Sequence, residues 1–172
     1  MTDVLKLRAE RKGLIAVGLR MIVGLSMSLL IAAPPARAQQ QLLPDPVAYE
    51  REHFQKECTN AQFEDDFAQQ IDINNDGLLD YVVNEGAIIC DGDRGPGCNE
   101  EGCPYNFYLQ VKEGGYFMIA TAQMYGYDFV KRFGNMVFVL KMHARYCDRT
   151  DAKPCEMTVR VRGTTFLTIS KQ

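Results

Sequence analysis

The sequence predicts a mainly β domain: an antiparallel meander with one short N-terminal helix, stapled by disulfide bonds. Three observations predict it. After residue 66, short runs rich in Val, Ile, Tyr, Phe and Thr alternate with glycine-containing turns, as in antiparallel sheets. One earlier segment has a helical period. The 6 cysteines, an even number, are typical of a disulfide framework in a small exported domain.

A single helix is expected over Pro46–Glu57. Asp45 stands where an N-cap is favoured, and a proline follows at the first helical position. Four residues recur at helical spacing and form one stripe: Val47, Arg51, Phe54 and Cys58. After this stripe the period changes to the alternation of strands, so the helix precedes the sheet.

Nine strands are expected to follow, divided by turns in which glycine tolerates the positive φ of tight turns. Alternate side chains within each run point to opposite faces of the sheet. In the run 135–144, Phe138 and Leu140 fall on the core side, and Lys141 and His143 fall on the wetter side. The strands are expected near Phe67–Ile71, Leu79–Asn84, Ala87–Cys90, Tyr105–Lys112, Tyr116–Ala122, Tyr127–Arg132, Asn135–Ala144, Glu156–Arg162 and Thr164–Ile169.

Two parts of the chain resemble each other. The segment 80–120 contains an apolar strand, a cysteine-bounded loop and a hairpin, and the segment 137–169 repeats that order. We therefore expect two similar β units that stack on each other.

Residues 1–38 have the three-part layout of a cleavable secretory signal peptide. Basic residues come first, residues 21–33 carry no charge, and Ala36 and Ala38 provide the small side chains that signal peptidase requires. The uncharged run of 13 residues is shorter than the ~20 that a membrane helix needs. We expect cleavage after Ala38, a mobile lead-in over 39–44 and a single β-rich domain over 45–172. The protein is expected to be periplasmic or secreted, and to meet the membrane only during export.

Removal of the leader makes the protein acidic. The whole chain has 19 basic and 22 acidic side chains and a formal charge of -3, and the leader holds 6 of the basic and 2 of the acidic ones. The remaining 134 residues therefore carry a net charge of -7. Such a charge argues against nucleic acid as a partner and favours divalent cations or basic proteins.

All six cysteines lie in the part expected to be exported, where thiols oxidise. No C-x-x-C motif accompanies the two histidines, which argues against a zinc site. Cys147 and Cys155 flank a short polar loop and are expected to pair. For the other four, the first choice is Cys98 with Cys103 and Cys58 with Cys90, and the alternative is Cys90 with Cys103 and Cys58 with Cys98.

One motif carries chemistry. The segment Asp72-Ile73-Asn74-Asn75-Asp76-Gly77-Leu78-Leu79-Asp80 places oxygen side chains at positions 1, 3, 5 and 9 and a glycine at position 6. Alternate spacing points these oxygens into a tight loop, and hard oxygen ligands suit Ca2+. Carboxylates crowded in this way repel one another without a cation. Ca2+ is therefore the expected cofactor, in a structural role. The expected ligands are the side chains of Asp72, Asn74, Asp76 and Asp80 and the carbonyl oxygen of Leu78.

This segment resembles the D-x-[DN]-x-D-G-x-x-D calcium loop of FG-GAP and VCBS-type repeats, over about Phe67 to Val83. An EF-hand needs a bidentate Glu at position 12, where this chain has Val83. With the cysteine-bounded loops 98–103 and 147–155, the motif also resembles a group of small exported proteins of Gram-negative bacteria. In that group glycine is usual at the position of Asn75, and the first cysteine pair encloses C-G-x-G-G-C. The resemblance implies a calcium loop between two strands and brings no activity with it.

Residues for common enzyme mechanisms are sparse after the leader. Ser170 is the only serine and lies two residues from the end, and an even set of cysteines leaves no obvious free thiol. The two histidines lack carboxylates at zinc-ligand spacing. The 20 acidic side chains leave a carboxylate-based glycan hydrolase open, although the chain has no tryptophan to stack on a sugar.

We therefore expect an exported, non-enzymatic binding or structural module whose partner is a protein or a cell-wall component. The segment 105–129 holds more aromatic residues than one small core obviously needs. Within it, Met124, Tyr125 and Tyr127 are the expected exposed contact patch. One alternative is a periplasmic inhibitor of a basic cell-wall hydrolase, which suits the acidic charge and the disulfides. The other alternative is the carboxylate-based glycan hydrolase.

Overall fold

The computed structural model describes residues 42–172 except 133 and 152, within one compact unit. The expected signal peptide, its cleavage site and residues 39–41 of the expected lead-in lie outside the described residues. In the described part the chain is mainly β, with one α-helix and three antiparallel sheets, which confirms the predicted fold class. This part contains no helix that is long and apolar enough to cross a membrane.

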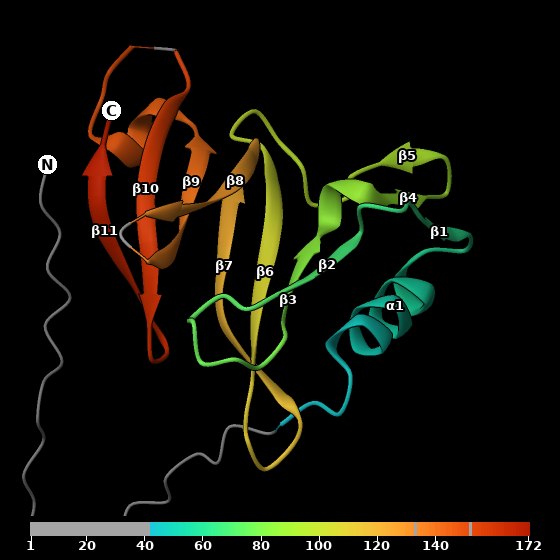
Figure 1. Ribbon diagram of the computed structural model, residues 1–172. Coiled ribbons are helices and arrows are strands. Elements are labelled where there is room, and N and C mark those ends of the chain that lie inside the picture. The colour runs from blue at the N-terminus through green and yellow to red at the C-terminus, as the bar shows by residue number, and fades with distance from the viewer. Residues whose placement is uncertain (1–41, 133, 152) are drawn as a thin grey trace, which may run out of the picture. The chain divides into compact units, whose positions relative to one another are not determined.

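The first sheet has four antiparallel strands in the order β2-β3-β6-β7 (Figure 1). Alternation divides its side chains between two faces. Val82 and Phe107 belong to the core shared with the second sheet, whereas Val83 and Tyr108 belong to the core under the helix. The strands are β2 (Ala68–Ile71), β3 (Asp80–Asn84), β6 (Cys103–Gln110) and β7 (Tyr116–Met124).

The second sheet repeats this plan with the order β8-β9-β10-β11. In each sheet a short 3-10 helix follows the second strand, and a disulfide joins the connection after that strand to the first residue of the third strand. We call residues 68–124 the first unit and residues 126–171 the second unit. This connectivity confirms the predicted pair of similar β units. The elements are η1 (Glu85–Ala87), β8 (Gly126–Arg132), β9 (Asn135–Met142), η2 (Ala144–Cys147), β10 (Cys155–Arg162) and β11 (Thr165–Lys171).

The main core lies between the two sheets. Phe107 of the first sheet and Phe138 of the second are fully buried, with ring centroids 5.6 Å apart in an edge-to-face arrangement. Phe138 and Leu140 are buried as the alternation in 135–144 predicts. The strand expected over 135–144 ends at Met142, because Nδ1 of His143 then accepts the Arg145 N–H at 3.3 Å and caps η2.

Helix α1 (Pro46–Glu57) begins and ends where the sequence predicts. The Asp45 carboxylate caps it by accepting the N–H groups of Val47 and Ala48 at 2.9 and 3.1 Å. Phe54 is buried in the second core, with side chains of the first sheet. The helix therefore covers the face of the first sheet that points away from the second sheet.

A small third sheet joins the helix to the first unit. Its strands pair in the order β1-β4-β5, and the sequence predicts neither β1 nor β5, because so few residues carry no alternating pattern. Before the helix, Leu43 forms an isolated antiparallel bridge with Tyr116 of β7, with both N–H to O=C distances at 2.7 Å. The strands are β1 (Ala61–Phe63), β4 (Ile88–Cys90) and β5 (Asp93–Arg94).

The three disulfides are those of the first-choice pairing. Cys58–Cys90 joins the end of α1 to β4, Cys98–Cys103 closes the first unit's loop, and Cys147–Cys155 closes the second unit's loop. No cysteine in the described part is free. The alternative pairing of Cys90 with Cys103 and Cys58 with Cys98 is not formed.

Candidate functional site

The loop 72–80 is closed by hydrogen bonds from its own backbone. Both oxygens of the Asp72 carboxylate accept N–H groups, from Asp76 at 3.1 Å and from Gly77 at 3.0 Å. Oδ1 of Asp76 accepts the Leu78 N–H at 2.8 Å. Asn75 has a φ of 64°, a left-handed value that asparagine tolerates, which explains how it replaces the usual glycine.

Asp80 faces inward from the end of this loop. It is fully buried, and its two oxygens accept the N–H groups of Ile73 and Gln110, each at 2.8 Å. Burial raises the pKa of Asp80 to about 6; the two hydrogen bonds oppose this, and the charges of Asp76 and Asp72 add to it. The carboxylate therefore ties the loop to β6, the neighbouring strand.

The donor types of the loop suit Ca2+, since they are carboxylate, amide and carbonyl oxygens. The side chains are engaged with one another and with the backbone: Asn74 Oδ1 accepts the Asp76 N–H and its Nδ2 donates to Asp76 Oδ2, both at 3.0 Å. Among the described residues, no group of three or more His, Cys, Asp or Glu side chains is arranged to hold a metal ion. The chemistry of the predicted ligands fits calcium, and their present arrangement is that of a hydrogen-bonded turn.

The three residues of the expected contact patch do not form one exposed surface. Met124 is fully buried between the sheets, so the prediction that it is exposed is wrong: alternation along β7 turns it inward. Tyr125 is 44% exposed and donates its hydroxyl to the Glu100 carbonyl at 2.8 Å. Tyr127 is half-buried and donates to Gln69 Oε1 at 2.5 Å.

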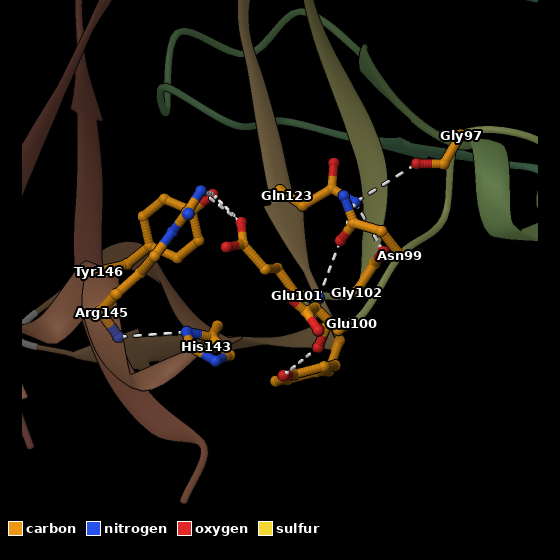
Figure 2. Close-up of polar contacts among 10 residues, drawn as sticks. Gly97, Asn99, Glu100, Glu101, Gly102, Gln123, His143, Arg145 and Tyr146 are labelled. Atoms are coloured by element: carbon orange, nitrogen blue, oxygen red, sulfur yellow. Dashed lines mark hydrogen bonds and ion pairs between the residues drawn. The ribbon is translucent and has the colours of Figure 1, made fainter. Parts of the chain in front are cut away.

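The first cysteine-bounded loop contacts η2 through charged and aromatic side chains (Figure 2). Glu101 is 8% exposed, and its carboxylate accepts the Tyr146 hydroxyl at 2.7 Å and pairs with Arg145 at 2.5 Å. A Cβ on Gly102, whose φ is 113°, would lie 2.3 Å from the Met124 carbonyl group. Glycine is therefore required where the first loop meets the connection between the units.

A cleft of about 500 Å³ lies beside α1, and the sequence did not indicate it. We call it the helix cleft. Nδ2 of Asn106 donates to Glu50 Oε1 and to Glu85 Oε1, each at 2.9 Å, so one amide nitrogen joins two carboxylates. The Tyr108 hydroxyl also donates to Glu50, and the Thr121 hydroxyl donates to Asn106 Oδ1 at 2.6 Å. The helix supplies one carboxylate, η1 supplies the other, and β6 supplies the link.

The helix cleft concentrates negative charge. Glu50 is 4% exposed, and neither Glu50 nor Glu85 forms an ion pair with any residue in the described part of the chain. Burial raises the pKa of Glu85 and the charge of Glu50 adds to this, while the Asn106 hydrogen bond and the charge of His53 oppose it. The one available signal in the sequence is Asn106, an amide between the aromatic residues Tyr105 and Phe107.

Comparisons with known proteins do not assign this chain to a family. The sequence matches no family model and none of the curated proteins, and no solved structure matches the fold.

Proposed function

We propose that this chain is an exported, non-enzymatic binding module that receives a cationic group of a basic partner protein in the helix cleft. The observation that carries the proposal is the pair of carboxylates, Glu50 and Glu85, held on one amide nitrogen and without an ion pair in the described part of the chain. Three disulfides suit the oxidising compartment to which such a protein is exported.

A lysine or arginine side chain fits the chemistry of this cleft. Buried charges in proteins are commonly paired, and a cation placed between the two carboxylates removes their mutual repulsion. Tyr49 and Met118 line the opening and are 50% and 45% exposed. Their apolar surface suits the aliphatic stem of a basic side chain, and a tyrosine ring attracts its charge. An inhibitor of a basic cell-wall hydrolase is the specific form of partner binding that this acidic cleft favours.

Binding of a tetralysine peptide to the oxidised full chain, measured by calorimetry, tests the proposal. Glu85→Gln keeps the shape of the side chain and its acceptor for Asn106 but removes the charge. We expect it to weaken binding by about tenfold, because a charge-assisted contact contributes about 1.5–3 kcal/mol. Glu100→Gln removes the same charge from an exposed residue outside the cleft and should leave the affinity unchanged.

Equal weakening by both variants would show only general attraction to an acidic surface and would contradict the proposal. A basic lysozyme supplies the second probe: loss of its activity in the presence of this protein, and recovery with Glu85→Gln, would support the inhibitor form.

Glycan hydrolysis is the second candidate, because a carboxylate pair with one raised pKa is the arrangement that glycoside hydrolases use. Release of reducing ends from peptidoglycan that disappears with Glu85→Gln would replace the binding proposal with this one. In that outcome Glu85 is the general acid, and Glu50 is the second carboxylate.

We also propose that the loop 72–80 binds Ca2+ in a structural role, supported by the oxygen donors of Asp72, Asn74 and Asp76. Saturating Ca2+ should raise the melting temperature by about 10 °C relative to EDTA. Asp76→Asn should reduce this shift, and Mg2+ should not reproduce it, since Mg2+ requires a more rigid octahedral site. An equal melting temperature in Ca2+ and EDTA would refute calcium binding.

A further inference from the structure

A second cleft, of about 480 Å³, lies apart from the helix cleft and from the loop 72–80. The first unit contributes residues of β2, β3 and β6 to its lining, and the second unit contributes the start of β8. We call it the tyrosine cleft, after Tyr105 and Tyr127. The other residues that bring polar side chains to its lining are Asp65, Asp66, Gln69 and Asn84.

The two tyrosine rings form a fixed aromatic wall. Their centroids are 5.9 Å apart in an edge-to-face arrangement. The ring of Tyr127 also packs edge-on against the buried Phe138 at 5.3 Å, and its hydroxyl is held by Gln69. Because the rings are already ordered, a ligand that packs on them does not have to immobilise them.

Two polar groups of the lining are available to a ligand. The Tyr105 hydroxyl and the Asp65 carboxylate have no hydrogen-bond or ion-pair partner among the residues that the structure describes. In the same part of the chain, every buried side-chain nitrogen and oxygen has a partner, so the unpartnered Tyr105 hydroxyl must reach solvent. Burial and the charge of Asp66 raise the pKa of Tyr105, which keeps this hydroxyl a hydrogen-bond donor.

The charge of the tyrosine cleft selects against anions. Two carboxylates, of Asp65 and Asp66, stand on its lining, and no Lys, Arg or His is among the described lining residues. An anionic ligand would be repelled, and a purely apolar ligand would leave the polar groups without partners. A neutral ligand with many hydroxyl groups meets both conditions.

We propose that the tyrosine cleft binds a neutral oligosaccharide. Sugar hydroxyls donate to the carboxylates of Asp65 and Asp66 and accept from the Tyr105 hydroxyl, while a C–H face of the sugar packs on the aromatic wall. The volume lies within the range of ligand pockets that enclose a small molecule. This proposal is independent of the helix cleft and of calcium.

Titration of the oxidised full chain with three neutral trisaccharides, triacetylchitotriose, cellotriose and maltotriose, tests the proposal by heteronuclear NMR. We expect saturable shifts with at least one sugar, grouped around Gln69, Tyr105 and Tyr127. Asp65 is exposed, so we expect Asp65→Asn to fold normally. This variant should weaken binding by about tenfold. Tyr105→Phe removes one hydroxyl and should weaken binding by about fivefold.

Tyr125→Phe is the matched control, because its hydroxyl binds the Glu100 carbonyl outside the cleft. We expect this variant to bind the sugar as the parent protein does. The proposal is overturned by the absence of saturable shifts with all three sugars, by shifts centred elsewhere, or by an equal loss in Tyr125→Phe. Melting temperatures of the three variants identify any loss of binding that comes from unfolding. In that case the sugar affinity of Asp65→Asn decides the outcome.

Discussion

The two units have the same strand order, and yet they differ in what they carry. Each is a four-stranded meander with a 3-10 helix after its second strand and a disulfide at the start of its third strand. Only the first unit, within the described part, is covered by an α-helix and joined to a third sheet, and it alone holds the loop 72–80 and the helix cleft. The strands that the two units share form the core. The helix and the loop 72–80, which only the first unit has in the described part, hold residues of the proposed sites.

The outer face of the first sheet explains this difference. Its inner face, with Val82 and Phe107, is as apolar as the matching face of the second sheet. Its outer face presents Asn106, Tyr108 and Thr121, which form the polar network under α1. A polar network of this kind is stable only if each member has a partner, and therefore it requires the helix.

The largest expected effect is the loss of unfolding free energy on removal of a disulfide, and it should differ between the bond at the helix and the bond of the second unit. Replacing Cys58 and Cys90 by alanine should lower the unfolding free energy by about 4 kcal/mol, and replacing Cys147 and Cys155 by about 2.5 kcal/mol, because the first bond closes a chain segment of 32 residues and the second one of 8. Urea denaturation of both double variants measures the two losses. Equal or reversed losses would show that native contacts, rather than chain entropy, govern these bonds.

The second largest expected effect concerns a substitution in the helix cleft. Glu50→Leu should lower the unfolding free energy by about 3 kcal/mol, because it leaves the buried Tyr108 hydroxyl without an acceptor and removes one of the two acceptors of the Asn106 amide. Glu52→Leu, on the exposed side of the same helix, should change the unfolding free energy far less. A small loss for Glu50→Leu would mean that water replaces the carboxylate and that the cleft is more open than its contacts indicate.

The pH dependence of the unfolding free energy should differ between the parent protein and Glu85→Gln. Because burial raises the pKa of Glu85 above its ordinary 4.5, the folded protein holds this proton more tightly than the unfolded chain does. The contribution of Glu85 to the unfolding free energy is therefore full below pH 4.5 and is lost as pH rises through the raised value. Urea denaturation at several pH values across this window should show that the difference in unfolding free energy between the parent protein and Glu85→Gln changes with pH.

The smallest expected effect concerns the contact between the units. Arg145→Ala removes an exposed side chain that pairs with the buried carboxylate of Glu101, and it should cause the smallest loss of unfolding free energy among these variants. Glu101 keeps the Tyr146 hydroxyl as a donor in this variant, which limits the loss. Chemical denaturation at low and high salt measures this loss, and a loss independent of salt would point to lost packing on Tyr146 instead.

Local signals in the sequence predicted most of the fold. The cap at Asp45, the alternation in 135–144 and the short loop between Cys147 and Cys155 act over a few residues, and the structure has the predicted helix, meander and bridge there. The helix cleft depends on Glu50, Glu85 and Asn106, which meet only in the folded chain, so no local pattern reveals it.

The environment of Asp80 in the loop 72–80 also depends on a contact that no local pattern shows. Its spacing places it among the calcium ligands, but one of its oxygens accepts an N–H group from Gln110, which lies 30 residues further along the chain. Met124 shows the matching limit for exposure: its neighbours in sequence are aromatic and glycine-rich, and only the position of the second sheet determines that it is buried.

The bridge between Leu43 and Tyr116 bears on how copies of this protein meet at high concentration. β7 is the last strand of the first sheet, and an open strand edge is a template on which another chain can add. The backbone groups of Tyr116 are already occupied by the segment that precedes the helix. The chain thus shields one end of its own sheet edge, which disfavours edge-to-edge aggregation there.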